Sequence, residues 1–124
     1  MLTTQEFYDK TISHLMRQGR ARTADEYGEH CLYRGPGGVS CAVGVHIPDK
    51  MYHKDMERKT IEAVSIYFPR VLKVIPDLSL ATSLQSLHDD YSYWTDNRLN
   101  ELGEMKTLRI AEIYNLTPYM GEWE

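Results

Sequence analysis

The chain has 124 residues, of which 42% are hydrophobic and 26% are charged, and its formal net charge is −4. This length and composition are typical of one soluble globular domain spanning residues 1–124. The mild acidity argues against nucleic-acid binding, and no apolar run approaches the roughly 20 residues needed to cross a bilayer.

The first predicted element is a helix that begins after Thr3. Thr3 and Glu6 have the spacing of a capping box, and Leu2 with Phe7 fits the hydrophobic staple around it. An apolar stripe of helical period follows, formed by Phe7, Tyr8, Ile12, Leu15 and Met16. Gly19 predicts the end of this helix. The N-terminus lacks the features of a signal peptide, so we expect a cytoplasmic protein.

Residues 29–45 carry the strongest β signal. Cys31–Arg34 and Val39–Val43 are short β-prone runs on either side of the turn residues Gly35-Pro36-Gly37-Gly38. Two such runs around a glycine and proline cluster predict a β-hairpin. Because an isolated two-stranded hairpin is marginally stable in water, we expect this one to pack against helices.

Three further helices are predicted in the remainder of the chain. One begins near Asp55, carries Ile61, Val64 and Phe68 inward and ends before Pro69. The next, capped by Ser79, places Leu80, Leu84, Leu87, Tyr91 and Trp94 on one face. The last, capped by Asp96, carries Leu99, Leu102, Leu108, Ile110, Ala111 and Ile113. Between them, Val71–Ile75 is either a strand or a helical turn. The predicted fold is therefore α+β: a mostly helical single domain, of about four helices, packed on a short β-hairpin.

Two sequence patterns stand out. The segment from Cys31 to Tyr52 reads C-x-Y-R-G-x-x-G-x-x-C-A-V-G-x-x-I-P-D-x-x-Y, and Leu84–Asp89 reads L-Q-x-x-H-D and is followed by Trp94. Together they resemble a set of short uncharacterised proteins encoded by bacteriophages and bacteria, over most of the chain. The resemblance implies a phage or prophage accessory gene and brings no catalytic residue with it. The chain departs from this family at Val45-His46, where the relatives have Cys-Leu, which argues against a shared three-cysteine metal site.

The cysteines allow several kinds of chemistry. Five residues are candidate zinc ligands: Cys31, Cys41, His30, His46 and His53. The spacing of the cysteines lacks the close Cys-x-x-Cys pairs of structural zinc sites. A disulfide across the predicted hairpin would act as a redox switch, and Cys41 with His46 or His88 is a conceivable nucleophilic pair. Packed, reduced thiols explain both cysteines more simply, so no metal, cofactor or catalytic residue is predicted.

Two polar segments are candidate ligand sites. Arg34, Gly35, Gly37 and Gly38 could hold a phosphate through backbone N–H groups and the guanidinium, although they match neither the P-loop nor the dinucleotide-binding pattern. His88 and Asp89 resemble the metal-binding His-Asp pair of phosphohydrolases, which needs further His and Asp ligands from other helices. Turn formation, and a histidine at the edge of a helix, explain the same residues by packing alone.

The C-terminal aromatic residues suggest an interface. Tyr and Trp are enriched at the energetic centres of protein interfaces. Tyr119, Met120 and Trp123 lie outside the helical pattern, so they either fold back on the domain or meet another chain.

These observations favour a small phage-type accessory protein that acts by binding, without chemistry of its own. The expected partner is a host protein, a second copy of the chain or a small signalling ligand, and neither nucleic acid nor a membrane. The alternative is a ligand- or metal-dependent enzyme that uses the predicted hairpin with His88 and Asp89. A structural virion component is a third interpretation.

Overall fold

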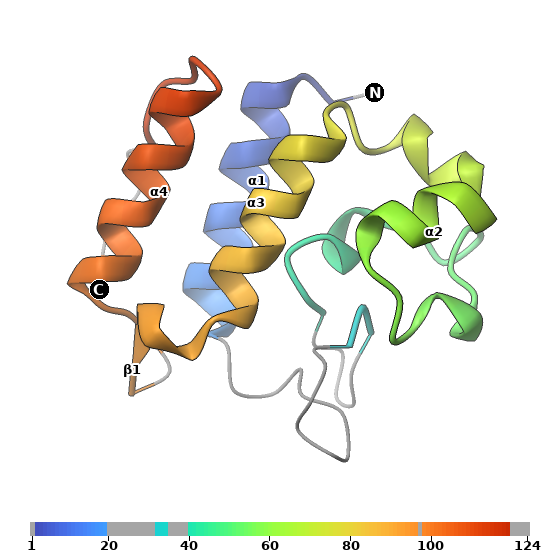
Figure 1. The fold of residues 1–124 in the computed structure, drawn as a ribbon, viewed down its shortest axis with the longest axis horizontal. Coiled ribbons are helices and arrows are strands. Elements are labelled where there is room, and N and C mark those ends of the chain that lie inside the picture. The colour runs from blue at the N-terminus through green and yellow to red at the C-terminus, as the bar shows by residue number, and fades with distance from the viewer. Residues whose placement is uncertain (1, 20–31, 35–39, 97, 120–124) are drawn as a thin grey trace.

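The computed structural model describes residues 2–19, 32–34, 40–96 and 98–119. Three helices lie side by side: α1 (Thr4–Gln18), α3 (Leu78–Asp89) and α4 (Glu101–Ile113) (Figure 1). The helix α3 contacts both of the others, and α4 runs in the opposite direction to them (Figure 1). The α+β class and its mostly helical character are as predicted.

The shorter elements flank this three-helix layer. The helix α2 (Ile61–Tyr67) packs against α3, and the 3-10 helices η2 (Gly44–His46), η3 (Lys54–Met56) and η4 (Pro69–Lys73) lie on the same side of the molecule (Figure 1). At the other side, the 3-10 helix η5 (Tyr91–Tyr93) leads into two short strands, β1 (Trp94–Thr95) and β2 (Arg98–Leu99).

The helix α1 has the ends that its sequence predicts. The Thr3 side chain accepts a hydrogen bond from the Glu6 N–H at 3.1 Å, and the Thr3 N–H donates to the Glu6 carboxylate at 2.9 Å. At the other end, Gly19 has a φ of 78° and its N–H donates to the Leu15 carbonyl at 2.8 Å. Because all these cues are local, they could be read directly from the sequence.

The β-hairpin predicted over residues 29–45 is wrong in the part that the structure describes. Residues 32–34 form no strand, and residues 40–46 turn into η2. The N–H groups of Tyr33 and Arg34 donate to the carboxylate of Glu57, at 2.8 and 3.2 Å, so they are not available to a partner strand. Tertiary contacts thus override the β propensity of this segment. The remainder of the predicted hairpin lies outside the described residues.

The antiparallel strand pair is found later in the chain. Trp94 is paired with Leu99, and Thr95 with Arg98. Asp96, in the connecting loop, has a φ of 51°, a left-handed conformation that Asp and Asn adopt more readily than most residues. The sequence signal was an Asp-Asn pair between two short runs, which is typical of tight hairpins.

The segment predicted as one helix from Asp55 is divided in two. Residues 54–56 form η3, and Thr60 caps α2 with its side chain. Ile61 and Val64 are buried, as predicted. In the following segment, Val71 lies in η4, so a helical turn forms there and not a strand.

The N-caps of α3 and α4 also differ from the predicted ones. Asp77, not Ser79, caps α3, and Asn100, not Asp96, caps α4. Each cap oxygen accepts a hydrogen bond of 3.0 Å from the N–H three residues further on. Since Ser, Asp and Asn are all favourable N-caps, composition alone did not rank these neighbouring positions. The end of α3 at Asp89 also removes Tyr91 from its apolar face.

One core joins all these elements. Its fully buried large side chains include Phe7, Tyr8, Ile12 and Leu15 from α1, Leu80, Leu84 and Leu87 from α3, Ile110 from α4, and Val43, Met56 and Val64 from the flanking segments. Inside it, the Tyr8 hydroxyl donates to the Thr107 carbonyl at 3.0 Å, which ties α1 to α4. A buried tyrosine normally satisfies its hydroxyl in this way.

Candidate functional site

Arg34 holds together the described part of the first sequence motif, which spans residues 31–52. Its Nη2 donates to the Ile47 carbonyl at 2.8 Å, and its Nη1 forms an ion pair with Asp49 at 2.5 Å. The guanidinium also lies over the Tyr52 ring, 4.7 Å from the ring centroid, in a cation–π contact. The Arg, Ile-Pro-Asp and Tyr positions of the motif therefore hold one another, and the phosphate site predicted at Arg34 has a strong internal competitor in Asp49.

Glu57 is the second organising group of this region. Besides the N–H groups of Tyr33 and Arg34, it accepts the Tyr52 hydroxyl at 2.6 Å. Burial, followed by the hydrogen bond and the charge of Glu57, raises the pKa of Tyr52 to about 12. The Tyr33 hydroxyl donates to the Lys59 carbonyl at 2.6 Å, and burial raises its pKa as well. Asp49 pairs with the Arg34 guanidinium, and Glu57, bonded to the Arg34 N–H, adds a second negative charge nearby, which disfavours an anion there.

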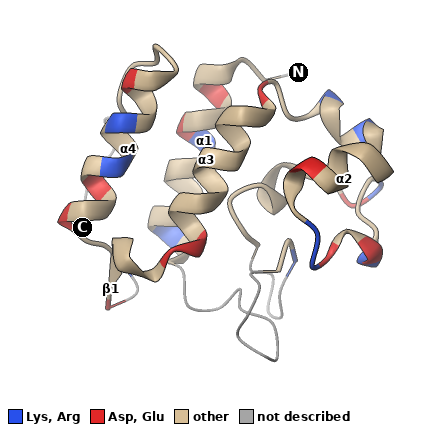
Figure 2. Ribbon diagram, in the orientation of Figure 1, with Lys and Arg blue, Asp and Glu red and all other residues tan. Residues whose placement is uncertain are grey.

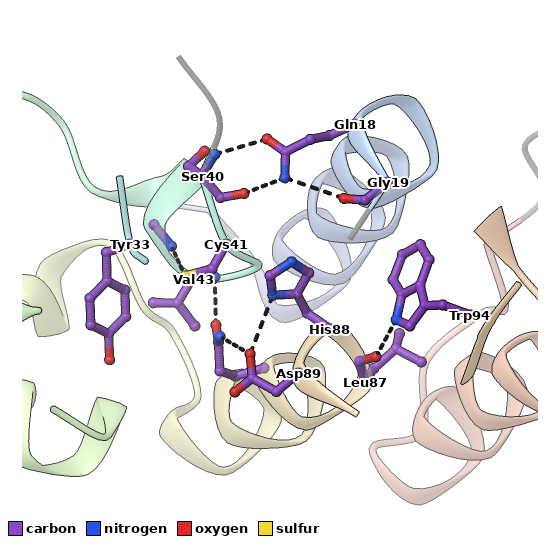
Figure 3. A network of polar contacts seen from close by, with 12 residues as sticks. Gln18, Gly19, Tyr33, Ser40, Cys41, Val43, Leu87, His88, Asp89 and Trp94 are labelled. Atoms are coloured by element: carbon purple, nitrogen blue, oxygen red, sulfur yellow. Dashed lines mark hydrogen bonds and ion pairs between the residues drawn. The ribbon is translucent and has the colours of Figure 1, made fainter. Parts of the chain in front are cut away.

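The second sequence motif, Leu84–Asp89, contacts the first through the side chain of Gln85. Its side-chain oxygen accepts the Val43 N–H at 3.3 Å, and its nitrogen donates to Asp89 at 2.9 Å (Figure 3). The Nδ1 atom of His88 lies 3.4 Å from the same Asp89 carboxylate. The fold thus brings L-Q-x-x-H-D against the Cys41–Val43 segment. Three further residues of the predicted ligand site, Gly35, Gly37 and Gly38, lie outside the described residues.

Several groups around this junction are closed to solvent. His88 is 0% exposed and its ring meets Trp94 edge-on, with 6.4 Å between the centroids. Cys41 is also 0% exposed, and its Sγ accepts the Gly44 N–H at 3.3 Å. Asp89 differs from His88 and Cys41 because 47% of its side chain is exposed. Within the described ranges, no three His, Cys, Asp or Glu side chains are placed to hold a metal ion. The candidate zinc ligands His30 and Cys31 lie outside those ranges.

The segment that begins at Ser40 is anchored to the end of α1. Gln18 accepts the Ser40 N–H at 2.8 Å and donates to the Ser40 carbonyl at 2.6 Å (Figure 3). The His14 Nε2 lies 2.8 Å from the same carbonyl oxygen, and burial lowers the pKa of His14. Residues 40–43 are therefore fixed between α1 and α3 by polar side chains of both helices.

His46 is buried against α1. Its ring stacks on Phe7, with the centroids 3.9 Å apart, and its Nε2 lies 2.6 Å from the Thr11 hydroxyl oxygen. Because that hydroxyl donates to the Phe7 carbonyl at 2.7 Å, the hydrogen-bond network assigns the proton to Nε2. Nδ1 then has no hydrogen-bond partner among the described residues. Burial lowers the pKa of His46 to about 3, so the ring is neutral near pH 7.

The C-terminal segment folds back on α1 as far as the structure describes it. Gln5 and Thr117 exchange two hydrogen bonds, of 2.8 and 2.9 Å. The Tyr119 N–H donates to the Tyr8 hydroxyl at 3.3 Å, and its ring packs against the core. Of the predicted interface residues, Tyr119 thus takes the fold-back alternative. Met120 and Trp123 lie outside the described residues.

The outward side of α4 was not predicted. Leu102, Met105, Leu108 and Ile113 are exposed by 58, 58, 49 and 60%, and together they form what we call the α4 outer face. Of the apolar residues that the sequence places on this helix, Leu102, Leu108 and Ile113 therefore lie outside the core. The inner face consists of Gly103, Thr107, Ile110 and Ala111, whose spacing of four, three and one is also helical. The small residues on that side allow α4 to approach the core closely, so the larger ones remain outside.

Comparisons with protein-family models, with curated protein sequences and with solved structures find no match. In the part of the chain that the structure describes, no helix has the length and hydrophobicity needed to traverse a lipid bilayer. The support for a function therefore comes from the contacts and exposed surfaces of the chain itself.

Proposed function

We propose that this is a phage-type accessory protein that acts by binding another protein through the α4 outer face. The observation that carries the proposal is the gathering of Leu102, Met105, Leu108 and Ile113, each about half exposed or more, on one regular helix. Single exposed apolar side chains are common, but their grouping on one face is typical of interaction surfaces. The phage-type origin rests on the sequence resemblance.

Binding has more support than catalysis because the motif side chains are already engaged. Arg34 contacts Ile47, Asp49 and Tyr52, and Gln85 contacts Val43. These contacts explain the motif as the framework of the fold. The alternative enzyme would require a substrate to reach His88, which is fully buried. The α4 outer face, in contrast, is not explained by packing among the described residues.

The α4 helix is also well fixed for binding. At its start, the Asn100 side chain donates to the Ser92 carbonyl at 2.9 Å. In its middle, Thr107 accepts the Tyr8 hydroxyl, and at its end the Leu116 N–H donates to the Ala111 carbonyl at 2.8 Å. A preformed, rigid helix loses little conformational entropy when a partner covers it.

The proposal can be tested by site-specific photo-cross-linking in bacterial cells. A benzophenone amino acid replaces Met105 in the full chain, and a matched control carries it at Lys50, which is exposed but lies outside α4. We expect a discrete covalent adduct at position 105 and its absence at position 50. No adduct at position 105, or the same adducts at both positions, would contradict binding through this face.

A further inference from the structure

The charged residues along α4 change from acidic to basic at its middle, and one further acidic residue, Glu112, follows in the last turn. Glu101 and Glu104 occupy the first half, and Lys106 and Arg109 follow, as the red and blue bands of the helix in Figure 2 show. Met105 lies between the two pairs. The stretch from Glu101 to Arg109 is acidic in its first half and basic in its second, so it is electrostatically complementary to a copy of itself that runs in the opposite direction. Beyond this stretch, Glu112 forms an ion pair of 3.1 Å with Arg109 of the same helix.

In an antiparallel pair of identical helices, residues that are equally far from the two-fold axis lie at the same level. With Met105 on the axis, Glu101 lies at the level of Arg109 in the second copy, and Glu104 at the level of Lys106. The same symmetry brings Leu102 level with Leu108, and Met105 level with itself.

The pattern is specific for this register. Moving the axis to Glu104 or to Lys106 removes these oppositely charged levels. A parallel pair would set each charge against the same charge of the second copy, which is unfavourable.

From this charge pattern on an exposed apolar helix, we infer that the α4 outer face binds the same face of a second copy, antiparallel, with Met105 on the two-fold axis. The inference rests on the proposed binding role of this face. Leu102, Met105 and Leu108, three residues apart, form the kind of ridge through which helices pack. Methionine suits the self-contact at the axis because its side chain adapts its shape easily.

The expected dimer is weak. A helix of 13 residues is about 20 Å long, so one helix pair buries less than the roughly 1,600 Å² of a standard interface. We expect a dissociation constant on the order of micromolar, which corresponds to a reversible dimer.

A charge-swap experiment tests both the partner and its direction. One variant carries Glu101→Lys and Glu104→Lys, and the other carries Lys106→Glu and Arg109→Glu. Between residues 101 and 109 each variant then carries one sign of charge, and by symmetry each altered pair occurs twice. By sedimentation velocity of the full chain, each variant alone should dimerise at least about tenfold more weakly than the wild type. An equimolar mixture should form a heterodimer of nearly wild-type affinity. A matched control, Arg70→Glu with Lys73→Glu on the exposed surface of η4, should dimerise as the wild type does.

The outcomes separate the two proposals. Recovery in the mixture also shows that both variants fold. Homodimers of wild-type strength in either swapped variant, or no recovery in a mixture of folded variants, would overturn the antiparallel arrangement. The wild-type chain could instead stay monomeric at high concentration while position 105 cross-links to a different protein in cells. That result would contradict self-association and would support the binding role of the α4 outer face. Absence of both the dimer and the adduct would overturn both.

Discussion

A Cβ atom on residue 44 would stand 2.0 Å from the carbonyl oxygen of Tyr33 and 2.7 Å from its carbonyl carbon. Gly44 is therefore required by the close approach of two backbone segments. The atoms that it faces are main-chain atoms, which cannot rotate away as a side chain can. This approach brings Tyr33 and Arg34 against the segment that carries Ile47 and Tyr52, so the glycine of the motif supports the Arg34 contacts.

The substitution Gly44→Ala should therefore be strongly destabilising. We expect the free energy of unfolding, measured by urea denaturation, to fall by about 3 kcal/mol or more, because the backbone must shift to accept the methyl group. Lys50→Ala, at an exposed position of the same segment, should change it by less than about 0.5 kcal/mol. A Gly44→Ala protein as stable as the wild type would show that the two segments separate easily.

Removal of the Glu57 charge should lower the pKa of Tyr52. In Glu57→Gln we expect a pKa below the wild-type value of about 12, because two of the causes that raise it come from Glu57 and the nearby Arg34 favours the phenolate. Burial of Tyr52 remains and keeps part of the shift. The pKa can be followed by NMR of the tyrosine ring carbons against pH, with Asp55→Asn as a control in the adjoining exposed turn. An unchanged Tyr52 pKa in Glu57→Gln would exclude their coupling.

The parts of the fold that the sequence predicts well depend on local interactions. For α1, the cap, the staple position and the terminal glycine lie within a few residues of one another, and each acts on its own neighbours. The predicted hairpin failed because the N–H groups of Tyr33 and Arg34 bond to Glu57, which is more than twenty residues away in the chain. The local β propensity of this segment gives no information about a contact that is so distant in the chain.

In the candidate site, too, local features could be predicted from the sequence and long-range contacts could not. The sequence patterns singled out the Arg34 and His88 segments, but the role of Arg34 depends on Asp49 and Tyr52, which only the fold places beside it. On α4, the apolar residues fall on two stripes of helical period, and residue size alone does not tell which stripe is buried. The small side chains of Gly103 and Ala111 mark the buried side because they allow close helix packing.

The stability of the fold should decrease in mild acid because of His46. Burial lowers its pKa to about 3 in the folded protein, with Lys10 and His14 as smaller causes, whereas an unfolded chain has the ordinary value of about 6.5. Between these values the unfolded chain binds a proton that the folded chain does not. The contribution of His46 is therefore fully present above pH 6.5 and is lost as the pH falls toward 3, by up to about 1.4 kcal/mol per pH unit.

The variant His46→Leu should flatten this decrease. The measurement is the free energy of unfolding in urea at several pH values between about 3.5 and 7, the window given by the folded and unfolded pKa values. His14, whose pKa is also lowered by burial, should leave a smaller residual slope. If the slope in His46→Leu equals that of the wild type, His46 is not the group that titrates.

The start of α4 should depend on Asn100 and not on Asp96. The Asn100 side chain accepts the Gly103 N–H at 3.0 Å and donates to Ser92 and Thr95 at 2.9 and 3.2 Å, so Asn100→Ala removes a helix cap and two further hydrogen bonds. We expect the free energy of unfolding to fall by about 1–2 kcal/mol, measured by thermal or urea denaturation. Asp96→Gly should be nearly neutral or slightly stabilising, because glycine accepts the positive φ of that position without strain. A larger loss in Asp96→Gly than in Asn100→Ala would instead place the cap at Asp96, where the spacing of the sequence alone predicts it.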